Sequence, residues 1–196
     1  MNFNIPPGTQ LLILANVTIF LVQELTGARL NDWFALWPIG APDFWIWQIG
    51  TYGFLHADWW HLFFNMFAVF MFGSQLEMLF GQRWYLTYFL VCIFSAAILH
   101  LIVAAVLNAP PYPTIGASGG VFGLLLAFAM YFPRRRIMLL FPPIPMPAWV
   151  FVMLFGLLEL FLGVSGFAPG VAHFAHLGGM VGGYLMIRYR RGGGRR

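Results

Sequence analysis

The sequence predicts an all-α membrane protein built as a bundle of six transmembrane helices. Of its 196 residues 61% are hydrophobic and 8% are charged, and the mean hydropathy is +0.80. A chain of this composition has too little polar surface to cover a soluble globule. A helix needs about 20 apolar residues to cross a hydrocarbon core about 30 Å thick. Six stretches approach that length, at about 9–26, 61–80, 84–107, 117–132, 148–164 and 171–189.

The chain predicts a single membrane domain over residues 1–189. The charges in its connecting segments predict how that domain is oriented across the membrane. All ten basic residues are arginines, and nine of them lie on one side if six spans alternate. The positive-inside rule then puts both termini in the cytoplasm, with residues 190–196 as a basic, disordered cytoplasmic tail. The net charge of +4 and the pI near 9.6 fit contact with anionic lipid in a bilayer, so we expect no nucleic-acid partner.

The N-terminus and the single cysteine bear on the compartment. Residues 1–10 carry no basic residue, and no small-residue cleavage site follows the first span, so we treat that span as a retained helix. The lack of a targeting peptide and the six-span form favour a prokaryotic plasma (inner) membrane. Cys92 stands alone, so it forms no intrachain disulfide and says nothing of the redox compartment. The sequence gives no oligomeric state.

The first external connection, residues 27–60, is long and unusually aromatic. Aromatic side chains at this density favour the headgroup region of a membrane. We therefore expect a loop that is half-embedded in the interface and braces the helices, although the pattern also permits a short amphipathic helix. The aromatic residues are Trp33, Phe34, Trp37, Phe44, Trp45, Trp47, Tyr52, Phe54, Trp59 and Trp60.

Polar residues in the second span lie at both of its ends. His61 and Asn65 are four residues apart and share one helix face. Polar groups in hydrocarbon usually face the interior of a bundle, where these two either bond between helices or line a hydrated site. At the other end, Glu77 can pair with Arg83 or cap backbone groups, which is a structural role.

The fourth span begins with Gly116-Ala117-Ser118-Gly119-Gly120-Val121-Phe122-Gly123. A proline-rich segment precedes it, so Ser118 should lie in the first turn of a membrane helix, among free backbone N–H groups. Glycine and serine together in an apolar segment usually form a helix-packing face. Because span four is short and arginines follow it, Ser118 should lie below the outer membrane boundary, within reach of an external hydrated cavity.

Spans five and six carry the remaining polar groups. Glu159 is an intramembrane acid, and such residues are often functional, but the sequence names no partner for it. Span six contains the pairs Gly178/Gly182 and Gly179/Gly183, and span four offers Gly119/Gly123. If these small-residue faces pack together, His176 comes to the depth of Ser118. His173 receives no role from the sequence, and His100 is expected to be a satisfied interfacial histidine.

These residues predict nucleophilic catalysis. A serine hydroxyl is a poor nucleophile near neutral pH unless a base such as a neutral imidazole removes its proton. Ser118 and His176 would form this dyad, with Phe122 fixing the ring and no carboxylate well placed to orient it. The Ser118 N–H, His61 and Asn65 could donate hydrogen bonds to an oxyanion.

A metal site is the competing interpretation of the histidines. His56, His61, His173 and His176 all lie toward the same side of the membrane. No His-Glu-x-x-His motif is present, however, and no second cysteine could add a ligand. We therefore expect no metal and no other cofactor.

These motifs, in this order, resemble the rhomboid family of intramembrane serine proteases. The resemblance runs from Trp47 through His61 to Asn65 and Gly116-Ala117-Ser118-Gly119 to Ala175-His176-Leu177-Gly178-Gly179 and Gly183. It implies a six-transmembrane-helix rhomboid-like bundle with a long interfacial first external loop, and a lateral gate formed by span five and the loop after it. It also implies the roles assigned above to Ser118, His176, His61 and Asn65, with Gly116, Phe122 and Gly179 in support. Gln48 and Phe122 depart from the arginine and tyrosine that are frequent in the family.

The function expected from the resemblance is hydrolysis of peptide bonds in or near the transmembrane segments of other membrane proteins. The alternative is a noncatalytic rhomboid-like protein that binds transmembrane helices, although the presence of both Ser118 and His176 argues against it. A six-span transporter is disfavoured because the polar residues gather at one depth.

Overall fold

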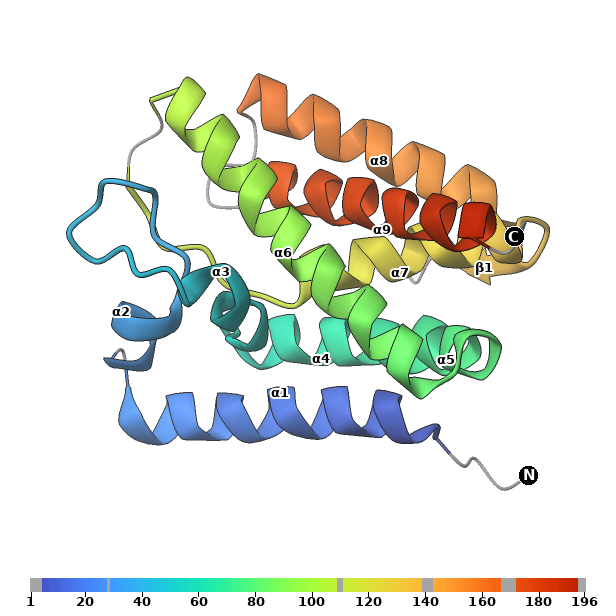
Figure 1. Cartoon of the computed structure of the whole chain (residues 1–196), viewed down its shortest axis with the longest axis horizontal. Helices are drawn as coiled ribbons and strands as arrows, with labels where there is room; N and C mark the ends of the chain where they lie inside the picture. The colour runs from blue at the N-terminus through green and yellow to red at the C-terminus, as the bar shows by residue number, and fades with distance from the viewer. Residues whose placement is uncertain (1–4, 28, 109–110, 139–142, 167–171, 194–196) are drawn as a thin grey trace.

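The computed structural model describes residues 5–27, 29–108, 111–138, 143–166 and 172–193, and most of them are helical (Figure 1). The long elements correspond to the six predicted apolar stretches. They are α1 (Pro7–Thr26), α4 (Trp59–Ala68) continued through the π-helical turn η2 (Val69–Gly73) into α5 (Ser74–Phe80), α6 (Gln82–Val106), α7 (Ser118–Tyr131), α8 (Ala148–Ser165) and α9 (His173–Gly193).

Four of these elements are long and apolar enough to cross a membrane, which makes the chain an integral multi-pass membrane protein. They are Pro7–Thr26, Trp59–Phe80, Gln82–Val106 and Ala148–Ser165. α7 is apolar but has 14 residues, about 21 Å of helix, which is shorter than a hydrocarbon core. α9 is not among the four, and arginines crowd its C-terminal end. The six-span bundle therefore remains a prediction for α7 and α9.

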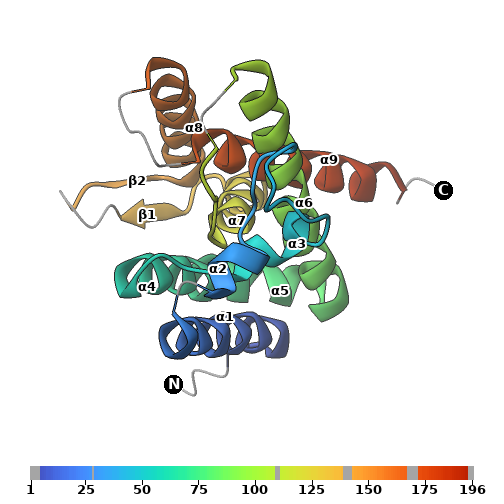
Figure 2. The same ribbon diagram turned by 90° about the vertical axis from the view of Figure 1, so that its left-hand side faces the viewer.

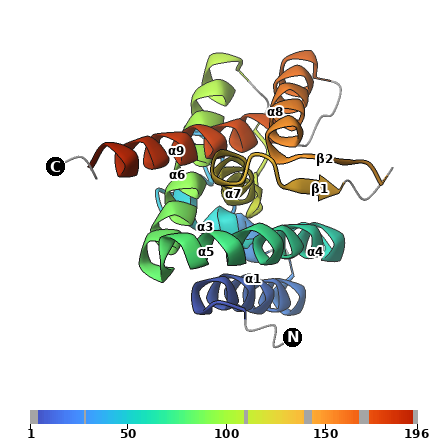
Figure 3. The ribbon, with the colours of Figure 1, turned by 90° about the vertical axis from the view of Figure 1, so that its right-hand side faces the viewer.

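The short helix α7 lies at the centre of the molecule. Figures 2 and 3 show it surrounded by α6 and α9 and by the α4–α5 segment, while α1 lies on the outer side of α4 and α5. Most α7 side chains are buried, from Gly119 to Ala129. A helix that is apolar all round suits this position, because every face of it contacts protein. In contrast, α8 lies at the edge of the bundle, with only 22% of its residues buried.

Glycines allow α7, α6 and α9 to approach closely. A β-carbon on Gly179 would overlap the carbonyl oxygen of Gly119, so α9 and α7 pack backbone to backbone here, as predicted. The other pair, Gly178 and Gly182, does not face α7. A β-carbon on Gly178 would lie 2.8 Å from the carbonyl oxygen of Ser95, and one on Gly182 would lie 2.5 Å from the Ser95 side chain. Gly183 also faces α6, because a β-carbon there would overlap the Tyr88 hydroxyl and lie 3.3 Å from the Cys92 sulfur. Of the four glycines, Gly179 is the one that packs against α7, and the other three make room for α6.

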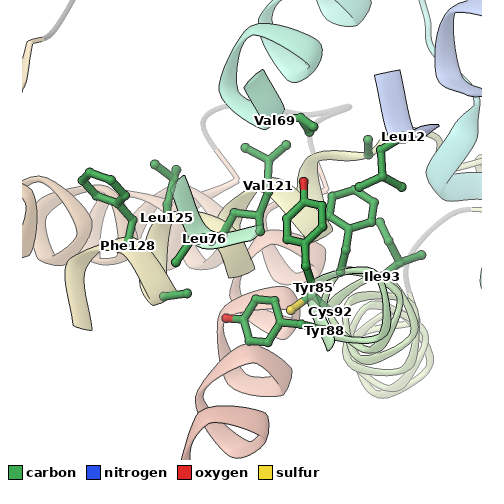
Figure 4. Packing of buried hydrophobic residues seen from close by; sticks show 14 of the residues in the cluster. Leu12, Val69, Leu76, Tyr85, Tyr88, Cys92, Ile93, Val121, Leu125 and Phe128 are labelled. Carbon is green, nitrogen blue, oxygen red and sulfur yellow. The ribbon is translucent and has the colours of Figure 1, made fainter. Parts of the chain in front are cut away.

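Aromatic side chains of α6 fill the space between these helices (Figure 4). Tyr85, Tyr88 and Cys92 are fully buried and pack beside Leu76 of α5 and Val121 of α7. The Tyr88 hydroxyl donates to the Gly123 carbonyl at 2.7 Å. α6 and α7 are thereby held together within one continuous apolar core.

The aromatic loop contains two short helices, α2 (Arg29–Phe34) and α3 (Gln48–Thr51), and the 3-10 turn η1 (Tyr52–Phe54). Gln48 is fully buried, and its side chain contacts three backbone groups, donating to the carbonyls of Trp33 and Asp43 and accepting from the Trp37 N–H. Trp47 donates to the Trp33 carbonyl at 2.9 Å. The neutral amide that replaces the frequent arginine therefore ties the loop together by uncharged hydrogen bonds.

Two features differ from the expected all-helical chain with a disordered tail. A small antiparallel hairpin follows α7, with β1 (Arg136–Met138) paired to β2 (Pro145–Pro147). α9 continues to Gly193, and Arg190 lies over the rings of Phe80 and Trp84 at 4.7 and 4.8 Å. Cation–π contacts of this kind hold the first part of the predicted tail in the helix. Residues 194–196, and most of the loop predicted to form the gate with α8, lie outside the described residues.

Candidate active site

Ser118 is the first residue of α7, as the sequence predicts. Gly116 just before it has a φ of +130°, which glycine adopts readily, and its N–H donates to the Tyr52 carbonyl at 3.0 Å. The turn into α7 is thus fixed by the aromatic loop. Because the first N–H groups of a helix have no acceptor within that helix, the Ser118 N–H remains available beside its own hydroxyl.

His176 of α9 reaches Ser118 across the close contact between α7 and α9. Its Nε2 atom lies 2.8 Å from Ser118 Oγ. Phe122, one turn after Ser118, stacks on the imidazole with ring centroids 4.3 Å apart and planes 7° apart. His176 therefore contacts both the serine and the aromatic ring that the sequence selected, and the stack fixes the plane of the imidazole.

The prediction that no carboxylate is well placed to orient His176 is wrong. Glu159 of α8 brings its Oε2 atom to 2.9 Å from His176 Nδ1 and to 2.6 Å from His173 Nδ1. The sequence contained one signal for this contact. An acid inside one membrane helix is followed in the next helix by two histidines three residues apart, which share a helix face.

The predicted oxyanion donors His61 and Asn65 line the same cavity as Ser118. Asp58 caps α4 by accepting from the His61 N–H at 2.8 Å, and His61 Nδ1 accepts from the Ala57 N–H at 3.3 Å. A neutral imidazole with Nδ1 as acceptor carries its proton on Nε2. A β-carbon on Gly116 would lie 2.8 Å from that Nε2, so the glycine leaves the room His61 needs to face Ser118.

The side-chain amide of Asn65 has one N–H group that can donate a hydrogen bond into the cavity. One of its N–H groups donates to the His61 carbonyl at 2.9 Å. A side-chain amide has two N–H donors, so the second remains for a ligand.

The cavity has a volume of about 520 Å³. That is room for several water molecules or for an extended peptide segment. Polar groups from α4, α7 and α9 line it, and the proline-rich segment before α7 forms another part of its wall. Its lining residues are Tyr52, Ala57, His61, Asn65, Tyr112, Pro113, Thr114, Ile115, Gly116, Ser118, Ala172, Ala175 and His176.

Behind the cavity, backbone and side-chain bonds hold this wall. Thr114 exchanges two backbone hydrogen bonds of 2.9 Å with Leu36 of the aromatic loop, and its hydroxyl contacts His100 Nε2 at 3.0 Å. His100 is thus a satisfied histidine, as predicted. Burial raises the pKa of Tyr112, which lies on the same wall.

His56 is a buried histidine for which sequence analysis assigned no specific role. Its side chain is 2% exposed and lies beside the His61 ring, with 5.0 Å between the centroids. Burial, reinforced by His61, lowers the pKa of His56 to about 3. His56 is therefore a neutral side chain that supports the start of α4.

Glu159, His173 and His176 also form the one group of potential metal ligands in the described ranges. Their ligand atoms lie within 4.8 Å of one another. Histidine nitrogen and a carboxylate oxygen are suitable donors for zinc. This set differs from the one considered from the sequence, because it includes Glu159 and leaves out His56 and His61.

Comparison with known proteins places this chain in a family. A family model described as "Rhomboid domain" matches residues 43–192, which include every residue of the cavity wall and Glu159. The chain belongs to the rhomboid family. The resemblance noted in the sequence is thereby confirmed.

Several curated relatives of this rhomboid are similar over most of its length. "Rhomboid protein 1, mitochondrial" of Saccharomyces cerevisiae is 32% identical over 67% of this chain, and "Rhomboid protease GluP" of Bacillus subtilis is 25% identical over 92% of it. "Putative rhomboid protease YdcA" of Bacillus subtilis is 31% identical over 71%. The matches cover 38%, 34% and 65% of those proteins, so this chain corresponds to only part of each relative.

Proposed function

We propose that this rhomboid is an intramembrane serine endopeptidase that hydrolyses peptide bonds in or near transmembrane segments of membrane proteins. The observation that carries the proposal is the 2.8 Å contact between Ser118 Oγ and His176 Nε2 at the wall of a polar cavity. A hydroxyl at this distance from an imidazole can transfer its proton as it attacks. Family membership and relatives named as proteases support the same activity.

The reaction follows the serine protease scheme. Ser118 Oγ attacks the scissile carbonyl while His176 Nε2 takes its proton, and Nε2 then gives that proton to the leaving amine. Water then attacks the carbonyl of the acyl-enzyme while His176 Nε2 takes its proton. Nε2 returns that proton to Ser118 Oγ as the ester bond breaks, which restores Ser118. The Ser118 N–H, His61 Nε2–H and the second N–H of Asn65 are the donors proposed for the tetrahedral oxyanion.

The substrate must unwind before it reacts. In a membrane helix each carbonyl accepts a hydrogen bond from four residues ahead, so the scissile group is not accessible to Ser118. Segments with small or helix-breaking residues near the cleavage site therefore suit this enzyme. Its proposed substrates are transmembrane proteins, which it meets in the lipid bilayer.

We also propose that both termini face the cytoplasm of a prokaryotic plasma membrane. Figure 1 shows the start of α1, the end of α9 and β1 at one end of the bundle and the aromatic loop at the other. Arg136 is the first residue of β1, and Arg134 and Arg135 come directly before it, at the same end as the arginines of α9. Reporter fusions to the C-terminus test the orientation, and a periplasmic signal would contradict it.

The function is tested by labelling the purified protein with a serine-reactive fluorophosphonate. We expect the wild type to label and to cleave a transmembrane reporter, and Ser118→Ala and His176→Ala to do neither. Equal labelling of all three proteins, or no cleavage by a folded wild type, favours the noncatalytic alternative. Cleavage that persists in Ser118→Ala and stops with a chelator would instead indicate metal-dependent hydrolysis.

A further inference from the structure

We infer that Glu159 is a third member of the active site, a positioning residue that orients the imidazole of His176 and stabilises the imidazolium formed during catalysis. The inference deepens the proposed serine endopeptidase function and rests on it. Its basis is a carboxylate on the edge helix α8 that contacts the side of His176 opposite to Ser118.

The contacts specify where the proton of His176 resides. An ionised carboxylate only accepts hydrogen bonds. Glu159 Oε2 lies 2.9 Å from His176 Nδ1, so the proton of the neutral ring is on Nδ1. Nε2 then carries a lone pair, and at 2.8 Å it can accept the hydrogen bond of the Ser118 hydroxyl. This is the tautomer that a general base requires, whereas the other one would present an N–H to the serine.

Three helices hold the ring in this position. Phe122 of α7 covers the face of the imidazole, with the ring planes 7° apart, and Glu159 of α8 holds its Nδ1 edge. Stacking alone permits a 180° flip of the ring about the Cβ–Cγ bond, because the flip keeps the ring plane while it exchanges the two edges of the ring. The hydrogen bond to the carboxylate removes that freedom and directs Nε2 at Ser118.

His173 holds the carboxylate in turn. It lies one turn before His176, with its ring plane at 89° to that of His176, and its Nδ1 contacts the same Oε2 atom at 2.6 Å. Glu159 is 9% exposed, so few water molecules compete with these bonds. The two imidazoles that contact Oε2 hold the Glu159 side chain in place more firmly than a single hydrogen bond would.

The carboxylate also acts on the charge that develops during the reaction. As the Ser118 O–H bond breaks and Oγ bonds to the carbonyl carbon, the proton moves to Nε2 and His176 becomes a cation. The Nδ1 proton stays on His176, and Glu159 accepts no proton in the step. A negative charge 2.9 Å from the imidazolium stabilises the cation most strongly in a buried site. The charge returns to zero when Nε2 protonates the leaving amine.

The test compares Glu159→Gln with Glu24→Gln, a matched change at an exposed glutamate of α1. We expect Glu159→Gln to keep its KM and its thermal stability but to lose at least about tenfold in kcat, because an uncharged amide stabilises the imidazolium less and can favour the wrong tautomer. Glu24→Gln should match the wild type. An unchanged kcat in a folded Glu159→Gln overturns the inference. A chelator that abolishes wild-type activity also overturns it, since the three side chains would then be metal ligands.

A second measurement does not depend on the variant folding. NMR of the side-chain nitrogens of His176 reports the tautomer of the wild type. These resonances are assigned by their loss in His176→Gln. We expect the Nδ1–H form, and the Nε2–H form would contradict the inference. A wild type that neither labels nor cleaves would remove the proposed function, whereas the tautomer measurement would still report on the contact with Glu159.

Discussion

The ring of Phe122 lies parallel to the imidazole of His176, with 4.3 Å between the two centroids. Stacked aromatic pairs contribute about 0.5–1.5 kcal/mol beyond the area they bury. Phe122→Leu keeps an apolar side chain but loses the flat face, so we expect kcat to fall by about three- to tenfold. Phe122→Tyr keeps the face and should retain wild-type activity. Reporter cleavage by the two variants, compared at equal amounts of folded protein, checks this, and equal rates would show that the stack is not needed.

Gly179 is the position at which α9 is least able to tolerate a side chain. A β-carbon there would overlap the backbone of Gly119, so the two helices would have to separate. We expect Gly179→Ala to lower the free energy of unfolding by at least about 2 kcal/mol. Separation would also move His176 away from Ser118. Gly192→Ala in the same helix is the control, because no atom lies within 4 Å of its added carbon. Thermal unfolding in detergent measures both variants, and similar midpoints would contradict the prediction.

Glu77 caps the N-terminus of α1. Its carboxylate accepts from the Gly8 N–H at 2.7 Å and from the N–H and hydroxyl of Thr9 at 2.6 and 2.8 Å, and it is 3% exposed. The capping role considered from the sequence is thus confirmed. Glu77→Ala leaves these buried donors without a partner, which should cost about 1–3 kcal/mol of stability. Glu24→Ala should cost little. Chemical denaturation of both variants tests the difference.

His56 should make the protein sensitive to acid. The pKa of His56 is about 3 in the folded chain and about 6.5 in an unfolded one. Between these values the unfolded state binds a proton that the folded state excludes, so stability falls as the pH decreases from about 6.5 toward 3. We expect His56→Leu to be less sensitive to pH in that window than the wild type. Unfolding midpoints at pH 7 and pH 4.5 measure this, and parallel losses in both proteins would assign acid sensitivity to other groups.

Local patterns in the sequence located most of the residues of the candidate site. Proline before an apolar run placed Ser118 at the start of a helix, and the four-residue spacing placed His61 and Asn65 on one face. These properties depend on neighbours along the chain, so they can be derived without knowing the fold. The length of an apolar run also predicts helix bounds well, as α1 and α6 show.

Contacts between helices depended on the tertiary structure. The helical repeat shows which face of α9 carries small residues, but it does not specify which neighbouring helix that face meets. In the structure, Gly178 and Gly182 face α6. For the same reason an isolated glutamate in α8 had no identifiable partner until α8 and α9 were placed side by side. A carboxylate buried in hydrocarbon is costly unless it has a hydrogen-bonding partner. Only the packing of the helices showed that this partner includes the histidine beside Ser118. The sequence by itself thus indicated the apolar helices and singled out Ser118 and His176 as the proposed dyad, while the arrangement of three helices decided which carboxylate contacts that histidine.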